Sequence, residues 1–184
     1  MLLVRCGQVP AALTDRLAVD LSRFVDQVLP PEISRPMVSI TTVADPVIDD
    51  EYSHEWNDAF ENLLRGIPRS TITILVTGQG LWYTHPRSRF IFIHSYDDMA
   101  VLLSIRRFRS PDRVAMLSRL SKEVIKALGM ALNVRPCPDE RCIMSHHLVP
   151  EDLDRNTGVC PSCRERITTS LIDRAQSKQG AEGI

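Results

Sequence analysis

Short apolar runs along the chain alternate with longer stretches in which apolar residues recur at helical spacing. The short runs predict strands at Met1–Cys6, Met37–Val43, Thr71–Gly78, Arg89–His94 and Met99–Ile105. The third run is apolar almost throughout, which is typical of a central strand covered on both faces. A strand, a helix and a second strand open the chain, and this order favours a crossover between parallel strands. The pattern predicts an α/β fold.

The stretches with helical spacing predict four helices. They are Asp15–Val28, Ser53–Arg65, Pro111–Asn133 and Arg164–Ala175. We expect Thr14 or Asp15 to cap the first helix and Ser110 to cap the third. Asn133 can adopt the left-handed conformation that ends a helix. Residues 176–184 are polar and contain glycine, so we predict a disordered tail.

Composition narrows the class of protein. The chain has 184 residues, a net charge of -1 and 24% charged residues, so no basic field points to nucleic acid as a partner. No apolar run approaches the roughly 20 residues that cross a bilayer, and we expect no membrane partner. The N-terminus is too short and too soon interrupted for a signal peptide. We therefore expect a single domain in the reducing cytoplasm.

Four of the five cysteines form two close pairs. Cys137 and Cys142 are four residues apart, Cys160 and Cys163 are two apart, and seventeen residues separate the pairs. This spacing is typical of one structural Zn²⁺ ion held by four thiolates. Two disulfides or four buried thiols are the alternatives, and a cytoplasmic location disfavours the disulfides. We expect the remaining cysteine, Cys6, to be a small buried hydrophobic residue.

The residues around these cysteines resemble a known family. The run KALGMALNVRPCPDERCIM follows, without a gap, the archaemetzincin signature His-Glu-x-x-His-x-x-Gly-x-x-His-Cys-x4-Cys-x-Met, and EDLDR and CPSC continue the likeness. The resemblance implies one domain over residues 1–175, with a mixed twisted sheet, flanking helices and a long active-site-type helix. It also implies a zinc-bound C-terminal part over residues 134–175, and it places Met144 at the Met-turn of these zinc peptidases.

The signature fails at the positions that hydrolysis needs. Lys126 and Met130 replace two zinc histidines, Ala127 replaces the general base, and Pro136 replaces the third histidine. An ammonium repels Zn²⁺, a thioether suits softer metals, and alanine cannot accept a proton. A register shifted by four residues needs a gap and still supplies no ligand set. We therefore expect no catalytic residues.

Several residues are candidates for a role in the former cleft. The ammonium of Lys126 can partly replace the charge of the lost metal ion and pair with a carboxylate, or it can extend to water. His146 and His147 are adjacent, so only one of them can face a cleft, and both can instead lie at the surface. His94 can point into the cleft or make an ordinary hydrogen bond at a strand end. A replacement metal site from these histidines and Met130 is a further alternative.

Three functions follow from these observations. The first is a non-catalytic pseudopeptidase that keeps a structural zinc ion and binds a peptide or protein in the former substrate cleft, along the rim at RFIFIH. The second is an active zinc-dependent peptidase with replacement ligands from His94, His146 and Glu123. The third is an interaction module organised by the four cysteines alone. The number of zinc ions per chain distinguishes the second from the other two.

Overall fold

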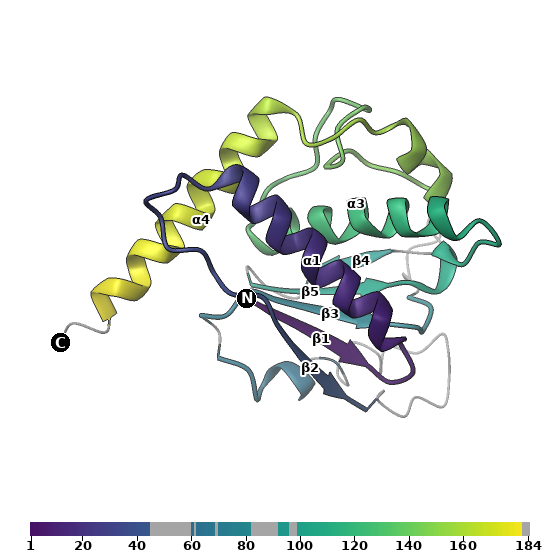
Figure 1. Ribbon diagram of the computed structural model, residues 1–184, viewed down its shortest axis with the longest axis horizontal. Coiled ribbons are helices and arrows are strands. Elements are labelled where there is room, and N and C mark those ends of the chain that lie inside the picture. Colours follow the sequence, from purple (N-terminus) through teal and green to yellow (C-terminus); the bar gives the residue numbers. More distant parts are fainter. Residues whose placement is uncertain (45–59, 61, 69, 82–91, 96–98, 182–184) are drawn as a thin grey trace.

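The computed structural model describes residues 1–44, 60, 62–68, 70–81, 92–95 and 99–181 (Figure 1). Most of the helix predicted at Ser53–Arg65 lies outside the described residues, although residues 60 and 62–64 are helical. The first part of the strand predicted at Arg89–His94 also lies outside them.

Five strands form one mixed sheet in the order β2-β1-β3-β5-β4. The strands are β1 (Leu2–Cys6), β2 (Ser39–Val43), β3 (Thr73–Thr77), β4 (Ile93–Ser95) and β5 (Ala100–Ser104). The predicted parallel crossover from β1 to β2 is confirmed, and β4 alone of the described strands runs antiparallel to its neighbour. Every residue of β3 is buried, which confirms the prediction of a central covered strand.

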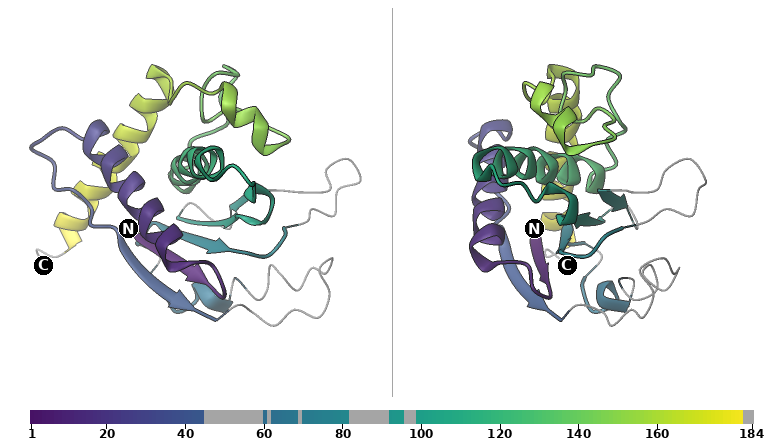
Figure 2. Two further views of the ribbon diagram at one scale, coloured as in Figure 1. Left: turned by 45° about the vertical axis from the view of Figure 1, so that its right-hand side comes forward. Right: turned by 90° about the vertical axis from the view of Figure 1, so that its right-hand side faces the viewer.

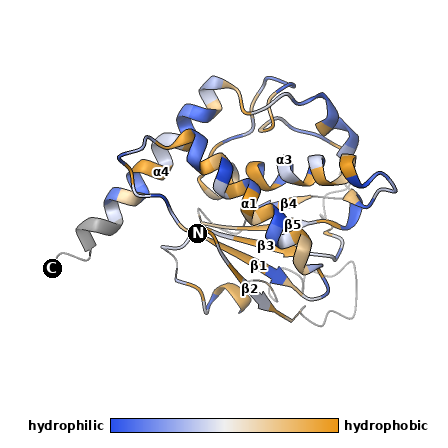
Figure 3. Cartoon of the chain, in the orientation of Figure 1, coloured by the Kyte–Doolittle hydropathy of each residue, from blue (hydrophilic) through white to orange (hydrophobic). Residues whose placement is uncertain are grey.

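Two helices, α1 (Ala11–Val28) and α3 (Arg113–Ala131), cover one face of the sheet (Figures 1 and 2). The larger hydrophobic core lies between these helices and the strands, whose apolar residues are visible in Figure 3. A smaller core around Phe60 and Leu75 covers the opposite face. Cys6 is fully buried in this second core, as predicted.

The predicted cap of α1 is wrong. The helix begins at Ala11, and Pro10 precedes it in an extended conformation with φ of -60°. Proline suits a helix start because its φ is fixed and a backbone N–H is not needed there. Thr14 lies inside the first turn, where its hydroxyl donates to the carbonyl of Ala11 at 2.8 Å.

The predicted cap of α3 is also wrong. The carboxylate of Asp112 accepts hydrogen bonds from the backbone N–H groups of Val114 and Ala115, at 2.9 and 3.0 Å. Ser110 instead accepts the N–H of Asp112 at 3.2 Å. Ser110 therefore supports the backbone of Asp112, and the carboxylate of Asp112 is the cap of the helix.

The end of α3 matches the prediction. Asn133 has a φ of 60°, and its N–H donates to the carbonyl of Met130 at 2.9 Å. The N–H of Val134 reaches back to the carbonyl of Gly129, also at 2.9 Å. This left-handed residue turns the chain away from the helix and toward the first cysteine pair.

The last helix, α4 (Pro161–Ala181), is longer than predicted. Residues 176–181 are helical, so the predicted disordered tail is wrong for them, and the side chain of Ser177 donates to the carbonyl of Asp173 at 2.8 Å. The hydroxyl of Thr168 donates to the carbonyl of Val28 at 3.3 Å, which joins α4 to the end of α1. Among the helices that the structure describes, none is both long and apolar enough to cross a membrane.

Candidate metal centre and the adjoining helix face

The four paired cysteines meet in space. The sulfur atoms of Cys137, Cys142, Cys160 and Cys163 all lie within 4.8 Å of one another, and those of Cys137 and Cys160 are 3.7 Å apart. Tetrahedral Zn–S bonds of about 2.3 Å require sulfur atoms about 3.8 Å apart. None of the five cysteines forms a disulfide, so the disulfide alternative is wrong. The cluster could hold one metal ion.

Tight turns on either side of the cluster bring the pairs together. The N–H of Cys137 donates to the carbonyl of Met144 at 2.9 Å, which closes the loop that contains the first pair. The backbone N–H groups of Met144 and Cys160 both point at the sulfur of Cys142, at 3.4 Å each. Such N–H···S contacts stabilise negative charge on sulfur, as a metal-binding thiolate requires.

The thiols shift one another's pKa. Burial raises the pKa of Cys142. Burial also raises the pKa of Cys163, and its hydrogen bonds with Cys137 and Cys160 raise it further. For Cys160, burial favours the thiol, but hydrogen bonds from Cys163 and the neighbouring thiols outweigh it and lower the pKa. A divalent cation at the centre of the cluster would stabilise all four thiolates.

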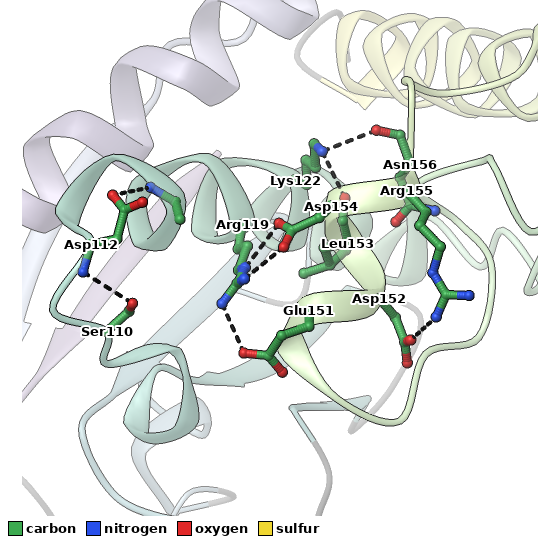
Figure 4. Close-up of polar contacts among 11 residues, drawn as sticks. Ser110, Asp112, Arg119, Lys122, Glu151, Asp152, Leu153, Asp154, Arg155 and Asn156 are labelled. Carbon is green, nitrogen blue, oxygen red and sulfur yellow. Dashed lines mark hydrogen bonds and ion pairs between the residues drawn. The ribbon is translucent and has the colours of Figure 1, made fainter.

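The segment between the cysteine pairs arches over α3 (Figure 2) and is tied to that helix by arginine. Arg119 donates to both carboxylate oxygens of Asp154, at 2.9 and 2.6 Å, and to Glu151 at 2.9 Å (Figure 4). Both acids lie in the short helix η2 (Pro150–Arg155), which is the EDLDR stretch of the sequence. The Arg119 hydrogen bond lowers the pKa of Asp154.

A lysine one turn further along α3 holds the same segment. Lys122 Nζ donates to the carbonyl oxygens of Leu153 and Asn156, at 2.7 and 3.0 Å (Figure 4). The anchoring role of Lys122 and Arg119 was not predicted from the sequence. The signal available in the sequence was the acidic EDLDR stretch. Its carboxylates needed basic partners, and a basic face of a helix could supply them.

Lys126 continues this face of α3, and its ammonium lies beside the segment that follows Met144. Its ammonium donates to the carbonyl of Ser145 at 2.6 Å and contacts Nδ1 of His147 at 3.0 Å. Only 8% of Lys126 is exposed. The expectation that Lys126 extends to water is therefore wrong, because a carbonyl and an imidazole bind its ammonium inside the protein.

A carboxylate completes this buried group. His147 Nε2 lies 3.1 Å from Oε2 of Glu123, and the two side chains are 2% and 1% exposed. The two atoms are within ion-pair distance, although they are not aligned for a hydrogen bond. The ring of Phe92 stacks on His147, with centroids 5.3 Å apart. Glu123, His147 and Lys126 thus form a connected polar cluster, which we call the buried triad.

The ammonium of Lys126 lies in a buried environment that disfavours its charge. Burial lowers the pKa of Lys126, and the negative charges of Glu123 and Cys142 only partly oppose this shift. Neutral His147 can accept from the lysine through Nδ1 while its Nε2–H faces the carboxylate. The imidazole thus lies between the ammonium of Lys126 and the carboxylate of Glu123.

The other candidate cleft residues do not join the triad. His146 is exposed, so only one of the two adjacent histidines faces inward, as predicted, and the surface expectation fails for His147. His94 pairs with Leu102, which belongs to the smaller core on the sheet face away from α3. Phe92 and Ile93 both contact the larger core, so side chains do not alternate between the two faces just before β4.

The remaining positions of the altered signature offer no ligand set. Ala127 is fully buried, Met130 is half-buried and Pro136 is exposed. Among the residues that the structure describes, the four cysteines are the only group of three or more His, Cys, Asp or Glu side chains placed to hold a metal ion.

Met144 packs directly against the long helix. It is fully buried, and a Cβ added at Gly129 would lie 2.6 Å from both its Sδ and its Cε. The glycine of α3 therefore makes room for Met144. Its lower helix propensity, worth up to about 1 kcal/mol against alanine, is offset by this close packing.

We expect Gly129→Ala to lower the free energy of unfolding by about 1–3 kcal/mol, because overpacking at a fully buried side chain outweighs the gain in helix propensity. Urea denaturation would measure the change. In a Met144→Ala background the same substitution has room, and we expect it to be neutral or stabilising. Equal effects in both backgrounds would show that the contact does not determine the cost.

The comparisons with known proteins agree with this geometry. No protein-family model matches the chain. An archaemetzincin from Methanopyrus kandleri is 24% identical over 170 residues, which cover 90% of this chain and 93% of that protein. The crystal structure of archaemetzincin from M. kandleri has a TM-score of 0.70 at 22% identity and covers 92% of this chain and 94% of that one.

The chain has the archaemetzincin fold. A second archaemetzincin, from Archaeoglobus fulgidus, has a TM-score of 0.67 at 20% identity, covering 90% of this chain and 98% of that one. A zinc-dependent peptidase from Methanocorpusculum labreanum has a TM-score of 0.68 at 18% identity, covering 91% and 100%. The predicted resemblance to archaemetzincins is therefore confirmed along about nine-tenths of the chain.

Proposed function

We propose that this protein is a non-catalytic archaemetzincin-like pseudopeptidase. One structural Zn²⁺ ion is bound by Cys137, Cys142, Cys160 and Cys163, and a peptide or protein segment binds in the former substrate cleft. The protein acts in the reducing cytoplasm, where its cysteines stay available to the metal. The zinc ion supplies folding free energy, not hydrolytic chemistry.

The observation that carries this proposal is the position of Lys126. In the archaemetzincin signature this position holds the first zinc histidine. Here it holds an ammonium that is bound to the carbonyl of Ser145 and to His147. A positive charge fixed at this point opposes the approach of a divalent cation. Ala127, at the position of the general base, has no group that accepts a proton.

A bound peptide would use the edge of the sheet. β4 is the last strand of the described sheet, and extended peptides commonly bind such edges through main-chain hydrogen bonds. The ammonium of Lys126 is buried beside Glu123, which compensates its charge, so we expect main-chain hydrogen bonds to supply most of the binding.

The alternative function is an active zinc-dependent peptidase with replacement ligands. It would require Glu123, His94 and His146 to converge on one ion. Glu123 is buried beside His147, His146 is exposed, and His94 shares a sheet face with Leu102. These positions favour the non-catalytic function.

Metal stoichiometry tests the proposal. We expect one zinc ion per chain by elemental mass spectrometry, unchanged after incubation with excess Zn²⁺ and gel filtration. We also expect no zinc-dependent cleavage of a quenched fluorescent peptide library. Two ions per chain, or cleavage that a chelator abolishes, would favour the active peptidase.

Restoring the family residues tests the position of the lost site. A variant with Lys126→His, Ala127→Glu, Met130→His and Pro136→His is expected to bind a second zinc ion. The matched control keeps Lys126 and changes the other three, and we expect it to bind one. If the fourfold variant also binds one, these positions do not converge on a metal.

A further inference from the structure

We propose that Arg166 is a positioning residue of the four-cysteine metal centre, where its guanidinium neutralises and shields the sulfur of Cys163 and so determines how firmly zinc is retained. This inference rests on the structural zinc of the proposed function. The role of Arg166 could not be predicted from the sequence, because an arginine on the exposed face of a helix is common.

The geometry of α4 places Arg166 beside the cluster. Cys163 lies in the first turn of α4 and is fully buried. Arg166 follows three residues later, so both side chains lie on one face of the helix. Its Nη2 donates to the sulfur of Cys163 at 3.0 Å, and its Nε donates to the carbonyl of Ser162 at 3.3 Å. The second hydrogen bond fixes the guanidinium in the orientation that the first one needs.

The charge of the centre explains why such a contact matters. Four thiolates carry two more negative charges than one Zn²⁺ ion neutralises. Cys142 receives two backbone N–H groups, which carry only partial positive charge. Cys163 receives a guanidinium with a full positive charge, at a sulfur that is buried from solvent. Outer hydrogen bonds of this kind orient the ligands of a metal and tune its affinity.

Arg166 also separates the sulfur from solvent. Together with Asn133, Arg135 and Glu165 it lines an open hollow of about 450 Å³ between the end of α3 and α4. Cys163 does not line this hollow. Truncating the guanidinium would therefore open a route from the hollow to the sulfur, along which water, chelators and alkylating reagents could reach it.

The test compares Arg166→Gln with Arg164→Gln, which removes an exposed arginine of the same helix. Zinc transfer to the chelator 4-(2-pyridylazo)resorcinol is expected to be at least tenfold faster for Arg166→Gln than for the parent chain. Arg164→Gln is expected to behave like the parent, and Arg166→Lys to be intermediate. Peptide mass spectrometry should show faster alkylation of Cys163 by iodoacetamide in Arg166→Gln.

Cobalt substitution measures an electronic property of the metal centre that would not change if Arg166 had only a structural role. With Co²⁺ in place of zinc, loss of the guanidinium makes the thiolate more electron-rich, so its charge-transfer band should shift to lower energy. The band is recorded for Arg166→Lys as well, so the proposal stays testable if the glutamine variant does not fold. Parent-like release rates and an unshifted band would overturn the role of Arg166. A parent chain without zinc would instead contradict the proposed function.

Discussion

Replacing Cys163 by serine is expected to release the metal ion and to destabilise the whole domain by several kcal/mol, the largest effect of any single change that we predict. Structural zinc contributes apparent free energies of about 10–16 kcal/mol in small zinc domains. Here the cluster joins the loop after α3 to the first turn of α4, so its loss frees both. Thermal unfolding and elemental analysis would measure the two effects together.

Cys6→Ala is the matched control for that experiment. Cys6 is also a buried cysteine that forms no disulfide, but it lies in the smaller core beneath the sheet. We expect this variant to keep one zinc ion and to lose about 1–2 kcal/mol from the small cavity alone. If Cys163→Ser and Cys6→Ala unfold at the same temperature, the four-cysteine cluster contributes no more than an ordinary core position.

Removing the carboxylate of Glu123 is expected to cost about 3–5 kcal/mol, because it leaves the ammonium of Lys126 buried without its compensating charge. Glu123→Ala would be compared with the parent by urea denaturation at neutral pH. The double replacement Glu123→Leu with Lys126→Met removes both charges at similar volume, and we expect it to be close to neutral. A double variant that is less stable than Glu123→Ala would contradict the pairing.

The pH dependence of stability provides a second measurement of the same triad. Burial holds the pKa of Lys126 below its ordinary value of 10.5, so the unfolded chain binds this proton more tightly than the folded one. The cost of the buried ammonium is fully present below the folded pKa, and stability rises with pH from there toward 10.5. The parent should therefore gain stability relative to Lys126→Met as pH is raised. A pH-independent difference would contradict the shift.

The fold and the metal centre could be predicted because both depend on local pattern. The apolar run at Thr71–Gly78 predicts a strand buried on both faces, and β3 is that strand. The spacing of the four cysteines predicts that they meet in one cluster when the loop after α3 closes. The left-handed φ of Asn133 provides the turn that starts this loop. Each inference needed only residues that are near one another in the chain.

The buried triad could not be predicted in this way. Periodicity places Lys126 on a face of α3, but it does not say which segment covers that face. The covering residues, Ser145 and His147, are about twenty positions away, and their approach depends on the closed loop and on stacking with Phe92. A lysine at an unknown depth is most simply expected at the surface, and tertiary contacts overrode that expectation.

The helix starts were missed for a different reason. Around Pro10 and Ser110 several residues within a few positions are each able to cap a helix, and the free energies of such alternatives differ by about 1 kcal/mol or less. Pattern alone does not resolve differences of that size. The carboxylate of Asp112 is the actual cap of α3 because it reaches two backbone donors at once.

The buried triad also limits which substitutions of Lys126 the protein can accept. A single substitution of Lys126 by histidine would take the ammonium from Ser145 and leave Glu123 without its cation, yet one imidazole does not make a metal site. The single change Lys126→His is thus expected to weaken the protein without completing a set of metal ligands. Under the proposed function, the contacts of Lys126 with Ser145 and His147 therefore make this position resistant to a return to histidine.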